Sequence, residues 1–187
     1  YGKEMLKIKD RHDNDLLYGP TNEELVTDII SKDIKSYKDL PKIMYHIQWK
    51  FRDEIRPRHG IMRCREFLMK DGYSFDSSHL DALYSYNKMF VSYLNIFRSI
   101  GLRVIPVLAD AGPIGGDLSH EFVVLTKSGE TKVYFDSTIM NIDFSDDKTL
   151  KRDELDRLVK SYTEKYSVTE DRYNEVAFKN EVSYENR

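Results

Sequence analysis

Two neighbouring stretches of the chain alternate between apolar and polar side chains, and together they predict a long antiparallel hairpin. Residues 43–51 place an apolar side chain at every second position, and residues 62–75 repeat this pattern more loosely. A period of two is typical of a strand whose two faces differ in chemistry. Residues 55–61 lie between these stretches and contain Pro57 and Gly60, so we expect them to form the connecting loop.

The segment before the hairpin has the spacing of a helix that begins at Thr21 and ends near Tyr37. Thr21 and Glu24 have the spacing of a capping box, which predicts Thr21 as the N-cap residue. Upstream, residues 4–18 alternate weakly around a polar turn and predict two short strands. The apolar side chains expected on one face of the helix are Leu25, Ile29 and Ile30.

A longer helix is predicted over residues 80–100, where Gly101 occupies the position of a C′ glycine. A charged helix is predicted over residues 150–166, and the residues that follow it carry only weak signals. Between the two helices, the pattern predicts three strands, over residues 102–109, 120–126 and 131–136.

These elements predict an α+β fold, in which a mostly antiparallel sheet has helices 22–37 and 80–100 on its faces. We expect residues 126–172 to form an appendage to that sheet.

The composition narrows the class of protein. No stretch of about 18 residues is apolar and free of charge, so we expect no contact with a membrane interior. The first residues do not have the basic and apolar regions of a signal peptide. Cys64 is the single cysteine, which excludes an internal disulfide and a zinc site built from cysteines. We therefore expect a folded, soluble domain in the cytoplasm.

The formal net charge of −3 hides a basic segment. Residues 42–70 contain eight basic side chains and three acidic ones. A concentration of positive charge in one segment of an otherwise acidic chain indicates an anionic partner, which could be a nucleotide or a nucleic acid.

The hairpin also holds the side chains best suited to chemistry. Arg52 and Glu54 are two residues apart, so on a strand they point to the same face. If Arg63 pairs near them across the loop, that face suits a nucleoside triphosphate, because guanidinium groups bind phosphate oxygens. A carboxylate can accept a hydrogen bond from the amino group of the nucleotide base, and the Phe67 ring can stack on that base. The alternative is a solvated hairpin whose charges pair with each other.

The histidines do not have the spacing of metal ligands. His120 and Glu121 begin like the zinc motif of metalloproteases, but Val124 stands where the second histidine would be. We therefore expect no bound metal site in this chain.

Several stretches of the sequence together resemble the catalytic core of bacterial-type prolyl-tRNA synthetases, which are class II aminoacyl-tRNA synthetases. The resemblance runs from Tyr18 to Phe122 and follows the order of the family's motifs. The matching stretches are residues 19–24 (GPTNEE), 50–58 (KFRDEIRPR), 63–71 (RCREFLMKD), 114–116 (IGG) and 119–122 (SHEF).

The resemblance implies a class II synthetase-like antiparallel sheet flanked by helices, present here in part. It implies that the parent enzyme activates L-proline with ATP, accompanied by Mg²⁺, and transfers the prolyl group to tRNA(Pro). It also implies a homodimeric parent. An RNA-binding module without catalysis, and a class II synthetase for another amino acid, are the alternatives.

The resemblance also implies roles for individual residues. The hairpin resembles motif 2, in which Arg52 and Arg63 would be catalytic. The residues that would bind ATP are Arg52, Glu54, Arg63 and Phe67. The residues that would bind proline are Thr21, Glu23, Arg52, Met69, Asp71 and His120. Arg56 and Arg58 would contact the tRNA acceptor end.

Each of these residues also has a purely structural interpretation. Thr21 could be only a helix cap, and Phe67 could belong to the core. His120 could be an ordinary hydrogen-bonded histidine on a strand. Tyr73 and Phe75 are expected to be core residues, not pocket residues.

The family pattern is incomplete in these 187 residues. The resemblance implies a partial catalytic core over residues 1–125, a short insertion over 126–172 in place of the family's editing domain, and the start of a return to the core over 173–187. Motifs 1 and 3 and the anticodon-binding domain have no counterpart in the sequence. We therefore expect a fragment of a prolyl-tRNA synthetase that is inactive in isolation.

Overall fold

The computed structural model describes residues 5–58, 60–111, 115–116, 118–142, 150–173 and 182–186. The chain forms two compact units, residues 1–82 and residues 83–187, and each is described by itself. Within the sequence matches, Ile114 lies outside the described residues, as does most of the predicted return to the core.

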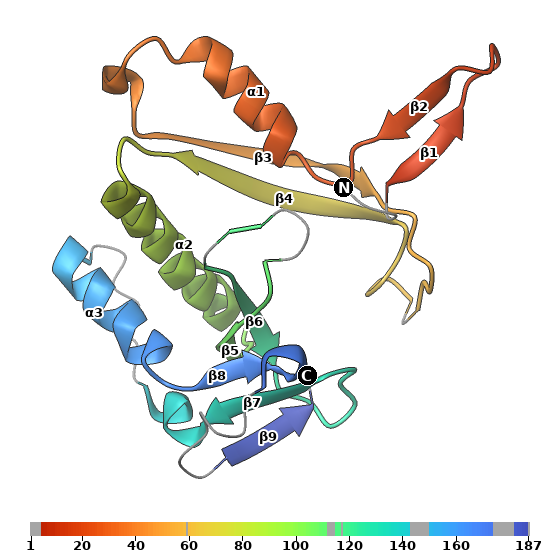
Figure 1. Cartoon of the computed structure of the whole chain (residues 1–187). Coiled ribbons are helices and arrows are strands. Elements are labelled where there is room, and N and C mark those ends of the chain that lie inside the picture. Colours follow the sequence, from red (N-terminus) through yellow and green to blue (C-terminus); the bar gives the residue numbers. More distant parts are fainter. Residues whose placement is uncertain are drawn as a thin grey trace. The chain divides into compact units, whose positions relative to one another are not determined.

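The first unit contains two antiparallel hairpins and one long helix. Strands β1 (Leu6–Lys9) and β2 (Asp15–Tyr18) pair around a tight polar turn, as the sequence predicts. Helix α1 (Glu23–Asp33) leads through a short 3-10 turn (Tyr37–Asp39) to the second hairpin. That hairpin consists of β3 (Lys42–Phe51) and β4 (Glu66–Phe75), and α1 runs alongside it (Figure 1).

Three details of α1 differ from the sequence prediction. The N-cap residue is Asn22, and the Thr21 hydroxyl donates to the side chain of Glu23, so the predicted capping box at Thr21 is wrong. The helix buries Val26 and Ile30, whereas Leu25 and Ile29 are about half exposed. It also ends at Asp33 and not near Tyr37, because Ile34 is extended and Ser36 caps the 3-10 turn.

The faces of the second hairpin separate apolar from polar side chains. Successive residues of a strand point to opposite faces, so the even-numbered residues of β3 share one face and the odd-numbered residues share the other. The odd-numbered face carries a row of exposed apolar side chains, between 53% and 72% exposed: Ile43, Tyr45, Ile47 and Trp49. The polar, even-numbered face is the one that α1 and the preceding loop approach, because Asn22 bonds His46.

The second unit is built on a five-stranded sheet. Helix α2 (His79–Ser99) leads into it and ends before Gly101, whose φ of 79° fits the predicted C′ position. Strands β5 (Val104–Leu108), β6 (His120–Val124) and β7 (Lys132–Asp136) lie where the sequence predicts them. Helix α3 (Arg152–Thr163) confirms the predicted charged helix, and a short 3-10 turn (Ser137–Asn141) follows β7.

The sheet has two further strands that the sequence analysis did not find. These are β8 (Ser167–Thr169), which leads into a 3-10 turn (Glu170–Arg172), and β9 (Val182–Asn186). The strand order is β6-β5-β8-β7-β9, and β5 and β8 are parallel while the other pairs are antiparallel. Residues 126–172 therefore supply two strands and a helix to the unit and do not form an appendage. The predicted boundary after residue 125 falls within this unit.

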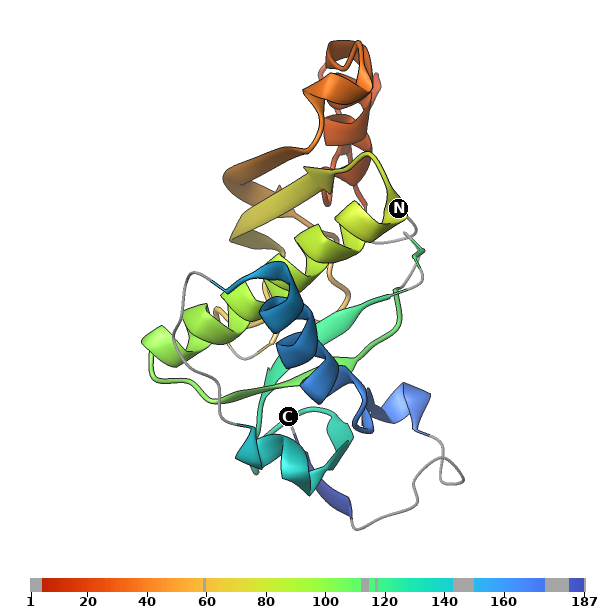
Figure 2. The ribbon, with the colours of Figure 1, turned by 90° about the vertical axis from the view of Figure 1, so that its left-hand side faces the viewer.

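One hydrophobic core holds the second unit together. Helices α2 and α3 cross on the same side of the sheet (Figure 2), and their apolar side chains meet those of the strands. Phe90 and Leu94 come from α2, and Leu155 and Val159 from α3. The buried strand residues in this cluster are Ile105, Val107, Val123, Val133 and Phe135.

No helix among the described residues is both long enough and apolar enough to cross a membrane.

Replacement of a core side chain should destabilise the second unit strongly. Phe135 is 1% exposed, so Phe135→Ala should lower the free energy of unfolding by about 3–5 kcal/mol through lost burial and the cavity left behind. Val124→Ala, on the exposed side of β6, is the control and should cost less than about 1 kcal/mol. Urea unfolding followed by circular dichroism measures both. Equal losses in the two variants would show that β7 does not contribute to the core.

Candidate active site

The side chain of Arg52 joins the hairpin to the loop that precedes α1. Arg52 follows β3 directly, and its Nε donates to the backbone carbonyl of Pro20 at 3.3 Å. Its guanidinium carbon lies 5.3 Å from the centre of the Phe67 ring, a cation–π contact. Arg52 and Phe67, which are both predicted for the nucleotide site, are therefore in contact with each other, next to the loop that carries Thr21.

The loop itself presents a carboxylate. The Thr21 hydroxyl donates to Glu23, which holds that carboxylate at the start of α1. Between them, Asn22 is buried and its side-chain nitrogen lies 2.8 Å from Nδ1 of His46 on β3. This bond fixes the loop against the polar face of the hairpin.

A group of titratable side chains continues along the same face. Asp71 on β4 accepts a hydrogen bond from the Tyr73 hydroxyl. The Lys50 ammonium nitrogen lies 3.5 Å from the Asp71 carboxylate. Burial, together with the carboxylates of Asp71 and Glu23, raises the pKa of Tyr73, because each disfavours the phenolate. Tyr73 is therefore a neutral donor, and it connects Asp71 to the Thr21–Glu23 loop.

The loop between β3 and β4 carries the remaining predicted residues. Glu54 accepts a hydrogen bond from the backbone N–H of Arg56 at 3.1 Å. Arg58 and Arg63 pair through their backbones at the outer end of the loop. The strand register places Arg65, and not Arg63, opposite Arg52, since the Arg52 N–H donates to the Arg65 carbonyl at 2.8 Å. The approach of the Arg63 side chain to Arg52 and Glu54, the condition set by the sequence analysis, stays a prediction.

Sequence reasoning missed four side chains that the structure brings to this face: Asn22, His46, Lys50 and Tyr73. Three of them could have been found from the two-residue spacing of a strand face. Counting back from Arg52 in steps of two residues reaches Lys50 and later His46, and one such step forward from Asp71 reaches Tyr73. Met69, predicted for the proline pocket, occupies the same face and pairs with Gln48. Tyr73 was expected in the core, and it is half-buried with its hydroxyl on Asp71.

His120 lies in the second unit. Its Nδ1 is 2.9 Å from the Tyr86 hydroxyl, and the Phe90 ring meets its ring edge-on at 5.3 Å. Burial lowers the pKa of His120, because the charged imidazolium loses its hydration. A small cavity of about 200 Å³ has His120, Phe90 and Tyr162 in its wall. These contacts fit the hydrogen-bonded strand histidine, and a role in binding proline stays a prediction.

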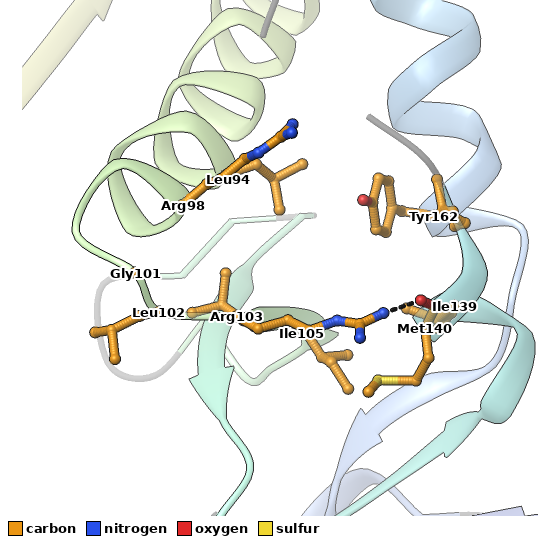
Figure 3. A pocket seen from close by; sticks show the side chains of 11 residues that line it. Leu94, Arg98, Gly101, Leu102, Arg103, Ile105, Ile139, Met140 and Tyr162 are labelled. Atoms are coloured by element: carbon orange, nitrogen blue, oxygen red, sulfur yellow. Dashed lines mark hydrogen bonds between the residues drawn. The ribbon is translucent and has the colours of Figure 1, made fainter. Parts of the chain in front are cut away.

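A larger cavity of about 440 Å³ lies elsewhere in the second unit, beyond the end of α2 (Figure 3). Its wall is mostly apolar and includes Leu94, Ile105 and Tyr162. Arg103 crosses its floor and donates to the backbone carbonyl of Met140. None of the predicted site residues lines it.

Across the described ranges, no cluster of three or more His, Cys, Asp or Glu side chains could hold a metal ion.

The family model described as "tRNA synthetase class II core domain (G, H, P, S and T)" matches residues 6–179. This match covers both units of the structure. The chain belongs to the class II tRNA synthetase core-domain family. The predicted class II fold is thus confirmed, with its helices and mostly antiparallel sheets.

Curated relatives of this class II core carry the name proline--tRNA ligase. The chain is 54% identical over 187 residues to the protein of Pelagibacter ubique, and 52% identical over 187 residues to that of Beijerinckia indica. These matches cover 100% of the chain, but only 42% and 43% of the two relatives. The chain therefore spans less than half the length of the proteins it matches.

Solved structures share the fold. A crystal structure of prolyl-tRNA synthetase from Cryptosporidium parvum, complexed with L-proline and AMP, matches with a TM-score of 0.58 and 22% sequence identity. The match covers 65% of this chain and 26% of that chain. A second structure of the enzyme from that organism, with halofuginone and AMPPNP, matches with a TM-score of 0.56.

The environment of His120 predicts a pH dependence of stability. Its folded-state pKa lies below the unfolded value near 6.5, so the unfolded chain binds the proton more readily. The free energy of unfolding should therefore fall as the pH drops from about 6.5 towards the folded-state pKa. In urea titrations between about pH 7.5 and pH 5.5, His120→Gln should lose part of this decline.

His12→Gln, at an exposed turn of the first unit, controls for the removal of one histidine. The His12 variant should keep the wild-type decline. The interpretation is wrong if the His120 variant shows the same pH dependence as wild type.

Proposed function

We propose that the full-length protein carrying this chain is a proline--tRNA ligase, which activates L-proline with ATP and transfers it to tRNA(Pro). The similarity to curated proline--tRNA ligases over the whole chain supports this specificity. The observation that carries the proposal is the contact of Arg52 with both the Pro20 carbonyl and the Phe67 ring. It joins a candidate nucleotide surface to a candidate amino-acid loop within one unit.

The proposed first step needs charge stabilisation more than a protein nucleophile. A proline carboxylate oxygen attacks the α-phosphorus of ATP, a new P–O bond forms, and the bond to the pyrophosphate leaving group breaks. Two anions must approach each other, so a guanidinium between them neutralises charge and orients both. Arg52 is proposed in this role.

The nucleotide is proposed to bind along the hairpin, with ATP entering as its Mg²⁺ complex. Phe67 offers a ring for the adenine to stack on, and the Arg52 guanidinium already lies over that ring. Glu54 is proposed to accept from the adenine amino group. Arg63, at the outer end of the loop, is proposed to reach the phosphates when ATP is bound.

The amino acid is proposed to bind at the loop before α1. Glu23, held by Thr21, offers a negative charge to the prolyl ammonium group. Asp71 and Met69 lie on the same hairpin face and would form the wall of the pocket. A role for His120 in binding proline is a further part of this proposal, and it rests on the resemblance to the family alone.

The exposed loop between β3 and β4 is proposed to contact the tRNA. Arg56 and Arg58 are both exposed there, and Arg63 and Arg65 add to the positive charge. Exposed guanidinium groups suit the phosphates of a nucleic acid. For the second step, the ribose hydroxyl at the 3′ end of the tRNA attacks the prolyl carbonyl, and AMP leaves. A homodimeric assembly and a cytoplasmic location are further parts of this proposal.

Loss of Arg52 should impair the first step. In the full-length protein, Arg52→Ala should reduce kcat/KM in proline-dependent ATP–pyrophosphate exchange by about 100-fold or more, the typical loss for one preorganised donor at a developing charge. Arg11→Ala, which removes a guanidinium from an exposed turn of the same unit, is the matched control and should keep wild-type exchange. Undiminished exchange in the Arg52 variant would exclude the proposed role.

Specificity can be tested without catalysis. In thermal-shift measurements on the full-length protein, prolyl-sulfamoyl-adenosine should raise the melting temperature more than its threonyl and alanyl analogues, because ligand binding to the native state stabilises it. A larger shift with another analogue would point to a class II synthetase for that amino acid. Salt-sensitive RNA binding without any analogue shift would instead favour an RNA-binding module.

A further inference from the structure

Lys50 is buried on the polar face of the hairpin. Its side chain is 1% exposed, although lysine is a side chain that folded proteins almost always leave in contact with water. It lies near the end of β3, opposite Phe67 and two residues before Arg52. Burial of an ammonium group is unfavourable unless a counter-charge accompanies it, so the position requires a partner.

The partner of Lys50 is Asp71. The two charged groups are 3.5 Å apart, and Asp71 is itself only 12% exposed. Within the described part of the chain, neither the Lys50 Nζ nor the Asp71 Oδ1 has a hydrogen-bond partner. The pair is therefore held by charge attraction inside the unit, with hydrogen-bonding capacity left over on both sides.

A chain of contacts connects this pair to the loop of the proposed amino-acid pocket. Asp71 accepts from the Tyr73 hydroxyl. The Tyr73 oxygen in turn meets the backbone N–H of Asn22, the residue next to Glu23, and the charge of the Glu23 carboxylate acts on it. Glu23 accepts from Thr21. Lys50 thus lies at one end of a path of contacts that reaches the loop carrying Glu23, the carboxylate proposed to meet the prolyl ammonium.

Lys50 is the counter-charge within this path. Glu23 and Asp71 bring two negative charges to one small region, where like charges repel each other. The Lys50 ammonium cancels one of them. Among Glu23, Asp71 and Lys50, one net negative charge then remains, which matches the single positive charge of an amino-acid ammonium group, while Arg52 is proposed to meet the negative groups of the substrates.

We propose that Lys50 is a positioning residue of the amino-acid pocket, and that it holds the Asp71 carboxylate so that Tyr73 and Glu23 keep the geometry that binds the prolyl ammonium. This inference rests on the proposed function. Lys50 acts on the substrate through Asp71 and Tyr73. It controls the affinity for the amino acid and leaves the affinity for ATP unaffected.

The test measures proline-dependent ATP–pyrophosphate exchange by the full-length protein. Lys50→Met removes the charge at similar volume and should raise the KM for proline by about 10-fold or more, because it leaves a buried carboxylate unpaired. The KM for ATP should change less than about 2-fold, since the path leads to the amino-acid loop. Lys70→Met is the matched control, because Lys70 is an exposed lysine of the adjacent strand on the opposite face, and it should change neither KM.

A double variant separates positioning from simple support of the fold. Asp71→Asn alone should also raise the KM for proline. Lys50→Met combined with Asp71→Asn should raise it less than the product of the two single effects, because the unpaired charge is gone. If Lys50→Met does not fold, Lys50→Arg, which keeps the charge but moves it, should still raise the KM for proline selectively.

Two results would overturn the inference while leaving the proposed function intact. One is an active wild type whose folded Lys50 variants keep the wild-type KM for proline. The other is an equal rise in the KM for proline and for ATP, which indicates general damage to the unit. Absence of proline-dependent exchange in the full-length wild type would instead reject the proposed function, and this inference with it.

Discussion

The candidate site depends on the alternation of side chains along one antiparallel hairpin. Because β3 and β4 pair over ten residues each without interruption, every second residue of both strands faces the same side. A shift of the register by one residue would move the whole set to the opposite face. Arg52, Lys50, Phe67 and Asp71 are brought together by this single constraint. The loop that carries Thr21 and Glu23 is then fixed to that face through Asn22 and Arg52.

Charge compensation is the second constraint on the site. Two carboxylates, a buried ammonium and a guanidinium lie on a surface that is partly withdrawn from water. Such groups are stable there only as a balanced set with definite geometry. The neutral Tyr73 hydroxyl links the members, since the raised pKa keeps its proton in place. The result is a face prepared for a ligand that carries both a negative and a positive group.

Sequence reasoning predicted most elements of the fold but not the way in which the second sheet is assembled. The hairpin, α2 and α3 follow from regular spacing, and the structure confirms them. Strand β8 has three residues, too few for a periodic signal, and it becomes a strand only by pairing with β5 and β7. Because β8 gives no such signal, the sequence pattern predicted residues 126–172 as an appendage. Long-range pairing decided their place.

In the candidate site, the printed sequence determined which residue types are available and which of them share a strand face. The motif stretches around Arg52 and Thr21 were sufficient to indicate a class II synthetase core before any coordinates. Only the tertiary structure decided that Asn22 occupies the N-cap position of α1 while Thr21 bonds Glu23. It also decided that Arg65 lies opposite Arg52 and that Lys50 is buried against Asp71. Spacing along the chain fixes local direction, whereas burial and charge pairing arise from contacts between segments that are far apart in the sequence.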